Sequence, residues 1–332
     1  MKVSRILLIA IIIALGFGAV ILANRPDTQP TTTSDSEQEI IKPTIVTTLF
    51  PFYDFTSQLV GDKAEVSLLL SPGVEPHTFE PTPQDIIKIQ EADIFIYTGD
   101  IMEPWVADIV ANIPDSVKII NASEGITLIE SKDDHSHGHD DEHGHEKEEK
   151  ETKVGSNLDP HFWLDFSNSI ISVQAISQAI SSLNILDNTQ LESNTNNLIA
   201  SLEQLDSDYR NTLSKCSNKI ILQAGHRTFE YLAKRYNLEY ITTEELSPNS
   251  DTSAKDIAKL ISEIKEHKSK TVFTEELVEP RIDNTIATET GASVLELNGA
   301  HNISSEQFTS KISFVDIMRQ NLENLSIGLE CK

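Results

Sequence analysis

Short apolar runs alternate with helix-type segments in two blocks of this 332-residue chain. Each run has the length of a buried strand, and the segments between runs, such as 52–60, 83–93 and 253–267, carry apolar residues at helical spacing. This alternation is typical of a mainly parallel sheet flanked by helices, so we expect an α/β fold with one sheet per block. The predicted strands are 44–50, 65–70, 93–99 and 117–121, then 219–225, 238–242, 270–275 and 293–298.

A helical region separates the two blocks. Its apolar stripe at three-and-four spacing comprises Leu198, Leu202, Leu205, Tyr209 and Leu213. We therefore divide the folded part into an N-terminal lobe at 43–165, connecting helices at 166–215 and a C-terminal lobe at 216–332. Two such lobes place a cleft between the carboxyl ends of their strands, where α/β folds usually bind ligands.

The N-terminus predicts export. Lys2 and Arg5 precede an uninterrupted apolar run that ends at Ala23, and its length lies between that of a signal peptide and a spanning helix. The basic flank predicts that the rest of the chain is extracytoplasmic. Because no convincing cleavage site precedes Asn24, we interpret 1–23 as a membrane anchor, the alternative being a cleaved signal segment and a periplasmic protein. The polar residues 24–42 are interpreted as a flexible linker.

The chain is strongly acidic, with a formal net charge of −26. A negative surface of this size repels nucleic acid, so we exclude DNA and RNA as partners. It is compatible with a protein that attracts cations.

A histidine-rich segment lies between the two blocks. Residues 133–151 hold five of the ten histidines, mixed with acids: His135, His137, His139, His143 and His145. The surrounding loop at about 131–155 is predicted to be disordered, because 133–151 offer no apolar residue to pack. Such a segment binds zinc weakly and without fixed geometry, so we interpret it as an accessory that gathers zinc; a purely solvated loop is the alternative.

Four further histidines lie on loops just after a predicted strand or at a helix entrance: His77, His161, His226 and His301. Taken singly, a loop histidine is more often a surface or packing residue than a ligand. Four at equivalent places indicate a metal site, since neutral imidazole suits zinc, copper, nickel and iron and disfavours calcium and magnesium. Three or four imidazoles would satisfy tetrahedral zinc. His267 follows an exposed helix and has no such setting.

Three motifs resemble those of a known family. PGVEPHTFEPTPQD (72–85), DPHFWLD (159–165) and GHRTFEYLAKRYNLE (225–239) resemble the metal-binding motifs of the solute-binding proteins of zinc and manganese ABC transporters (cluster A-I, or cluster 9). The resemblance covers about residues 43–330. It implies two α/β lobes joined by a long rigid helix, with a metal site in the interlobe cleft. It also implies a monomeric receptor that is not an enzyme. Such a receptor binds Zn²⁺ as its transported ligand and delivers the ion to a membrane permease.

The resemblance makes His77, His161 and His226 metal ligands. A histidine at the third position resembles the zinc-type members, whereas manganese-type members tend to have a carboxylate there. The fourth ligand departs from the family pattern, because the loop LELNGAHNIS has no acid after Glu296. We expect His301 to stand where the family has glutamate.

A different alignment would place Asn298 at the fourth position, with water completing the site. The resemblance also covers Glu275 or Glu276, which matches a glutamate near the cleft and is expected to orient a histidine.

Other interpretations stay open at this point. Within the family, the ligand would be manganese or another divalent metal. A zinc hydrolase would pair three histidines with an activated water and a carboxylate base, and the chain has no H-E-x-x-H motif. A surface protein would store zinc on the loop or adhere to a neighbouring cell.

Cys216 and Cys331 form either a disulfide, as exported proteins often do, or two unpaired buried thiols.

Overall fold

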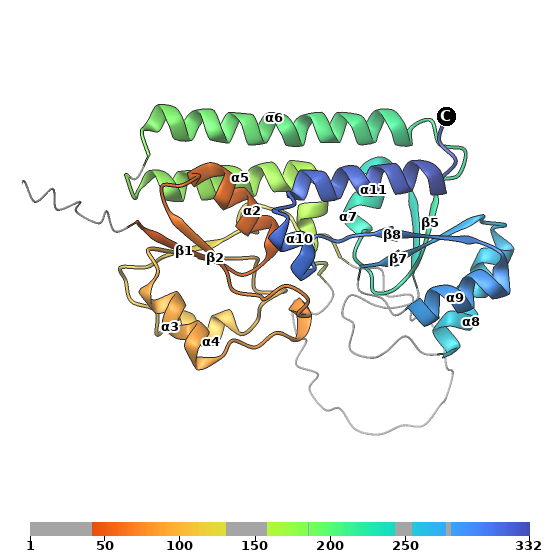
Figure 1. Ribbon diagram of the computed structural model, residues 1–332, viewed down its shortest axis with the longest axis horizontal. Coiled ribbons are helices and arrows are strands. Elements are labelled where there is room, and N and C mark those ends of the chain that lie inside the picture. Colours follow the sequence, from red (N-terminus) through yellow and green to blue (C-terminus); the bar gives the residue numbers. More distant parts are fainter. Residues whose placement is uncertain (1–41, 131–157, 185, 243–253, 277–279) are drawn as a thin grey trace, which may run out of the picture. The chain divides into compact units, whose positions relative to one another are not determined.

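The computed structural model describes residues 42–130, 158–184, 186–242, 254–276 and 280–332. These belong to a single compact unit, Lys42–Lys332, which contains two four-stranded parallel sheets (Figure 1). The expected membrane segment 1–23, the linker up to residue 41 and the histidine-rich loop lie outside the described residues. Within the described ranges, no helix has both the length and the apolar character needed to cross a bilayer.

The N-terminal sheet has the strand order β2-β1-β3-β4. Its members are β1 (Thr44–Thr47), β2 (Glu65–Leu68), β3 (Ile94–Tyr97) and β4 (Lys118–Asn121). On the central strand, Ile45 pairs with Val66 on one side and Ile94 on the other. The apolar run 44–50 is a strand only as far as Thr47, because Phe50 begins helix α2 (Phe50–Val60) with a proline in its first turn.

The C-terminal sheet repeats this topology in the order β6-β5-β7-β8. Its members are β5 (Ile220–Ala224), β6 (Glu239–Thr242), β7 (Thr271–Glu275) and β8 (Ser293–Leu297). All pairs in both sheets are parallel. The carboxyl ends of the strands in each sheet therefore meet at one edge. The loops that carry His77, His226 and His301 follow β2, β5 and β8 at these edges.

Each sheet is covered by helices on both faces. Outer helices cover one face: α3 (Pro83–Glu91) and α4 (Val106–Val110) on the first sheet, and α8 (Ala254–Glu266) and α9 (Pro280–Thr290) on the second. The other side carries α5 (Phe166–Ser181), α6 (Asn188–Leu213) and α11 (Phe314–Gly328). Figure 1 shows α6 running alongside α5 and α11. Helix α6 contacts α2, α5, α11 and α7 (Glu230–Tyr236), so it packs against helices of both lobes.

One apolar core runs through both lobes. It includes Phe52 and Trp163 from the first lobe and Leu232 and Phe314 from the second. The ring of Phe314 meets that of Phe55 edge-on at 5.1 Å between centroids. Because separating the lobes would expose this core, the interface resists the domain motion expected for lobes that share only a small contact.

Polar and covalent ties reinforce the core. Arg235 on α7 binds Asp206 of α6 through Nε at 2.7 Å and Nη2 at 2.8 Å, and reaches Asp165 before α5 through Nη1 at 2.7 Å. A disulfide joins Cys216 to Cys331. It fastens the end of the chain to the segment that enters β5.

Candidate metal centre

His77 is held by a short 3-10 turn, η1 (Pro76–Thr78), in the loop that follows β2. Pro76 fixes the first position of the turn, and the Glu75 carboxylate caps it by accepting the His77 backbone N–H at 3.0 Å. The side chain of His77 is half-buried. The loop therefore presents the imidazole from the N-terminal lobe while one side of it stays near solvent.

His161 precedes the 3-10 turn η2 (Phe162–Leu164), and Asp159 orients it. One Asp159 oxygen accepts both the His161 backbone N–H at 2.9 Å and the ring Nδ1–H at 2.8 Å, and both side chains are buried. Burial raises the pKa of Asp159 to about 7, although the bond from the His161 backbone opposes that shift. With Nδ1 occupied, Nε2 is the atom left to bind a ligand.

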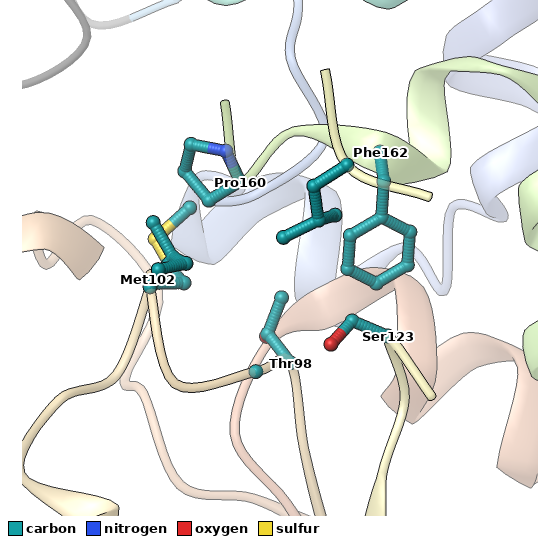
Figure 2. Close-up of a pocket in the computed structure, with 8 residues that line it drawn as sticks. Thr98, Met102, Ser123, Pro160 and Phe162 are labelled. Carbon is teal, nitrogen blue, oxygen red and sulfur yellow. The ribbon is translucent and has the colours of Figure 1, made fainter. Parts of the chain in front are cut away.

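A small cavity lies behind this loop, in the N-terminal lobe. Figure 2 shows it between Thr98, Met102, Ser123, Pro160 and Phe162. Its volume is about 10 Å³, enough for about one water molecule, and no histidine or acid lines it. The cavity is thus part of the lobe interior and separate from the histidine cluster.

His226 follows β5 and is oriented from β7. Its Nδ1 lies 2.6 Å from Glu275 Oε2, and its Nε2 lies 2.9 Å from the Thr228 hydroxyl. Gly225 makes this approach possible: its φ is +136°, and a Cβ there would lie 2.0 Å from Glu275 Oε1. Burial alone would lower the pKa of His226, but the Glu275 carboxylate outweighs it and raises that pKa.

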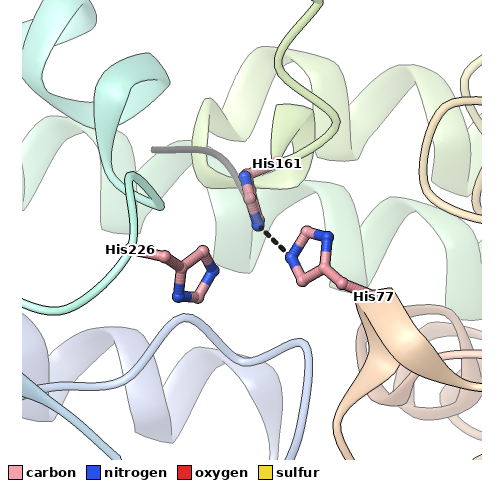
Figure 3. A group of neighbouring side chains, drawn as sticks. All are labelled: His77, His161 and His226. Carbon is pink, nitrogen blue, oxygen red and sulfur yellow. Dashed lines mark hydrogen bonds between the residues drawn. The ribbon is translucent and has the colours of Figure 1, made fainter. Parts of the chain in front are cut away.

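The four predicted loops bring their imidazoles into one group. Centroid separations run from 5.2 Å for the closest pairs to 6.2 Å between His77 and His301. One ligand nitrogen each from His77, His161 and His226 lies within 4.8 Å of the other two (Figure 3). The Nε2 atoms of His77 and His161 are 3.2 Å apart. Two nitrogens on a tetrahedral zinc at about 2.0–2.1 Å would be separated by roughly 3.3–3.4 Å, so this spacing fits one ion.

Burial keeps His77 and His161 uncharged in the free protein, in contrast to His226. It lowers the pKa of His77 and His161 well below the usual value, and neighbouring imidazoles lower both further. A neutral imidazole has a lone pair on one ring nitrogen, which is the form that binds a metal ion. The electrostatics therefore favour a cation bound among the rings.

His301 lies beside the three-histidine group and faces Glu276. Its Nε2 is 3.8 Å from Glu276 Oε1, and both side chains are buried. The other Glu276 oxygen accepts the Gly299 N–H at 3.0 Å. Burial, then repulsion from Glu275, raises the pKa of Glu276 to about 8. His301 thus packs beside the three-histidine group, with a carboxylate next to it, but it is not one of the three residues whose ligand nitrogens lie within 4.8 Å of one another.

Asn298, the alternative fourth ligand, is used within its own loop. Its side-chain oxygen accepts the Ala300 N–H at 2.8 Å, and its backbone pairs with the amide of Asn321 through bonds of 2.9 and 2.7 Å. This arrangement shapes the turn that carries His301.

Sequence reasoning missed two contacts that position the ligand loops. Trp163 donates its indole N–H to the Gly299 carbonyl at 2.8 Å, which joins the His161 turn to the His301 loop. Asp159 was also missed as the partner of His161, although its position two residues earlier in DPH was a usable signal. His267 lies at the end of α8 beside Glu263 at 3.5 Å, outside the cluster. The five histidines of 133–151 lie outside the described residues.

Comparison with known proteins identifies relatives along most of the chain. The family model described as "Zinc-uptake complex component A periplasmic" matches residues 45–328. The "High-affinity zinc uptake system protein ZnuA" of Bacillus subtilis is 36% identical over 290 residues, which cover 87% of this chain and 88% of that protein. The "Zinc-binding protein AdcA" of Streptococcus pyogenes is 32% identical over 285 residues, 85% of this chain but only 55% of that longer protein.

A solved structure agrees with the fold. The Zn(II)-bound ZnuA-like domain of Streptococcus pneumoniae AdcA superposes with a TM-score of 0.72 at 30% identity, covering 87% of this chain and 99% of that domain.

Proposed function

The chain belongs to the family of periplasmic zinc-uptake components, and we propose that it captures Zn²⁺ outside the cytoplasm and delivers it to the permease of an ABC importer. It is a zinc-binding transport component and not an enzyme. The observation that carries the proposal is the convergence of His77, His161 and His226, whose ligand nitrogens lie within 4.8 Å of one another. Each comes from a different loop, and two are oriented by carboxylates, the buried Asp159 and the half-buried Glu275.

The donor set favours zinc over manganese. Imidazole nitrogen suits zinc, whereas manganese prefers oxygen ligands. Neutral imidazoles do not compensate the charge of Zn²⁺ in a buried site. The carboxyl groups of Asp159, Glu275 and Glu276 lie next to the rings, and a bound cation would favour their ionised forms. On binding, the ion would replace the Thr228 hydroxyl as the partner of His226 Nε2.

His301 is proposed as the fourth ligand. Its ring lies 5.4–6.2 Å, between centroids, from the rings of the other three histidines, which supports this assignment. Replacing His301 with alanine should weaken zinc binding, while His301→Glu should restore most of the affinity, because a carboxylate is also a good zinc ligand. Equal affinities for the wild type and His301→Ala would show that water or Asn298 completes the site.

The partner and the setting follow from the family and the N-terminus. We propose that residues 1–23 tether the receptor to the outer side of the membrane, near its permease, and that the receptor works as a monomer. The histidine-rich segment is proposed to be an accessory that gathers zinc. The acidic surface, with a net charge of −26, is compatible with a cation receptor.

A metal-competition experiment tests this function. The full chain is titrated with zinc and with manganese against a chelator, together with His226→Ala and the matched control His267→Ala. The proposal predicts one tight zinc, much weaker manganese, loss of tight zinc in His226→Ala and no change in His267→Ala. Tighter binding of manganese than zinc, or tight zinc retained by His226→Ala, would contradict it.

A further inference from the structure

We propose that Asn302 is a positioning residue that sets the rate of zinc release by clasping the His77 loop to the C-terminal lobe. This inference rests on the proposed zinc site. Asn302 directly follows His301 and is buried, with 6% of its surface exposed. Its side chain crosses from one lobe to the other.

The Asn302 amide bonds both lobes at once. Its oxygen accepts the N–H of Gly73 at 2.9 Å from the N-terminal lobe and that of Ile303 at 2.8 Å from its own loop. Its nitrogen donates to the Val74 carbonyl at 2.5 Å. Gly73 and Val74 lie in the same loop as His77, a few residues before it. A single side chain thus connects the loops of two proposed ligands from opposite lobes.

The most direct route for release of the ion passes the His77 loop. His161, His226 and His301 are only 0%, 2% and 4% exposed, whereas His77 is half-buried. Val74 in the same loop is 38% exposed, so this loop covers the cluster from the solvent side. Outward movement of the loop would remove one ligand and open a path in the same step.

Local release of this loop is easier than separation of the lobes. The lobes share one apolar core, and Arg235 with its two acidic partners ties them further. The clasp consists of two hydrogen bonds between Asn302 and the loop. Breaking them is the smaller change, so we place the control of release at Asn302.

The test is a stopped-flow measurement of zinc release from the full chain into excess chelator. Asn302→Ala should release zinc about tenfold faster, which is the effect expected from losing two hydrogen bonds. The association rate should change little. The matched control is Asn324→Ala, which removes a bond from Asn324 to the Glu296 carbonyl inside the C-terminal lobe. The melting temperature of the zinc-free protein, measured for both variants, gives the loss of stability; it should be larger in Asn302→Ala, because Asn302 is buried and makes three hydrogen bonds, but only Asn302→Ala should release zinc faster.

A second variant separates the clasp from general stability. Asn302→Asp keeps the acceptor for Gly73 and Ile303 but loses the donor to Val74. The added negative charge would by itself slow the loss of a cation, so faster release from this variant would isolate the missing donor. Release at the wild-type rate from both variants would overturn the inference, as would a large loss of zinc-free stability in Asn302→Ala with normal release from Asn302→Asp. Failure of the wild type to bind zinc tightly would instead overturn the proposed function.

Discussion

Asp159 and Glu275 each fix the ring of a histidine by binding its Nδ1, at 2.8 and 2.6 Å. Such partners set the tautomer and the direction of the ring, and they increase the basicity of the ligand nitrogen. The two histidines belong to different lobes, so each lobe prepares its own ligand before the ion arrives.

Replacing Asp159 with asparagine tests this role. The amide oxygen can still accept from His161, but the negative charge is lost, so zinc affinity should fall about 10- to 100-fold. Chelator competition gives the affinity. Asp187→Asn is the control, because Asp187 caps α6 through Thr189 away from the site. Unchanged affinity in Asp159→Asn would show that the carboxylate does not support the metal.

At this scale the sequence predicted that four loop histidines lie together, but it predicted only part of their surroundings. His77, His161, His226 and His301 could be selected because each lies on a loop beside a predicted strand or helix entrance. The contacts of Asn302 with Gly73 and of Trp163 with Gly299 join residues more than 100 positions apart. They depend on how the lobes pack, so no local sequence pattern predicts them.

At the scale of helices and strands, the positions of the strands were predicted better than their lengths. Apolar runs continue into the following helix or loop because the same core covers both, as at Phe50, where α2 begins inside the predicted strand 44–50. The resemblance implied a single long connecting helix, and the structure has α6 alongside α5 and α11, with α6 in contact with helices of both lobes. The arrangement of α11 against α2 and α6 is a tertiary contact that helical periodicity does not predict.

The contact between α6 and α7 should give the protein a measurable acid sensitivity. Burial alone would raise the pKa of Asp206, but hydrogen bonds led by Arg235 and Tyr236 outweigh it and lower that pKa to about 2. The unfolded chain therefore binds a proton at higher pH than the folded one. The stability from Asp206 is present above about pH 4 and is lost as the pH falls towards 2.

Denaturant unfolding of Asp206→Asn from pH 7 to pH 2.5 measures this effect. The variant should be less stable than wild type at pH 7, and the gap should narrow below pH 4. Glu203→Gln, which changes an exposed acid on the same helix, should follow the wild type throughout. A gap that stays constant with pH would contradict the assignment.

The disulfide should stabilise the fold without taking part in metal binding. It joins residues separated by 115 positions and lies at the far end of α6 and α11. Replacing both Cys216 and Cys331 with serine should lower the free energy of unfolding by about 2–5 kcal/mol. Denaturant unfolding with chelator present gives this value, and a zinc titration of the same variant should be unchanged. An unchanged free energy of unfolding would mean that the bond adds nothing to stability.

At the scale of the whole molecule, the shared apolar core limits how far the two lobes can move relative to each other. The lobes are predicted as separate units at 43–165 and 216–332, yet their apolar residues form one continuous cluster that includes Trp163, Phe166, Tyr209 and Phe314. The division into lobes stays a prediction from the sequence pattern. With the core shared, we expect zinc binding to order the ligand loops and to leave the two sheets in place.

The central claim is that the cleft histidines, and not the histidine-rich segment 133–151, form the tight zinc site. The most direct measurement is a zinc titration against a chelator for three forms: the full chain, the chain without 133–151, and His77→Ala. We expect the form without the segment to keep one tight zinc and His77→Ala to lose it. Loss of tight zinc with the segment, together with its retention in His77→Ala, would contradict the claim and make the protein a histidine-rich zinc scavenger.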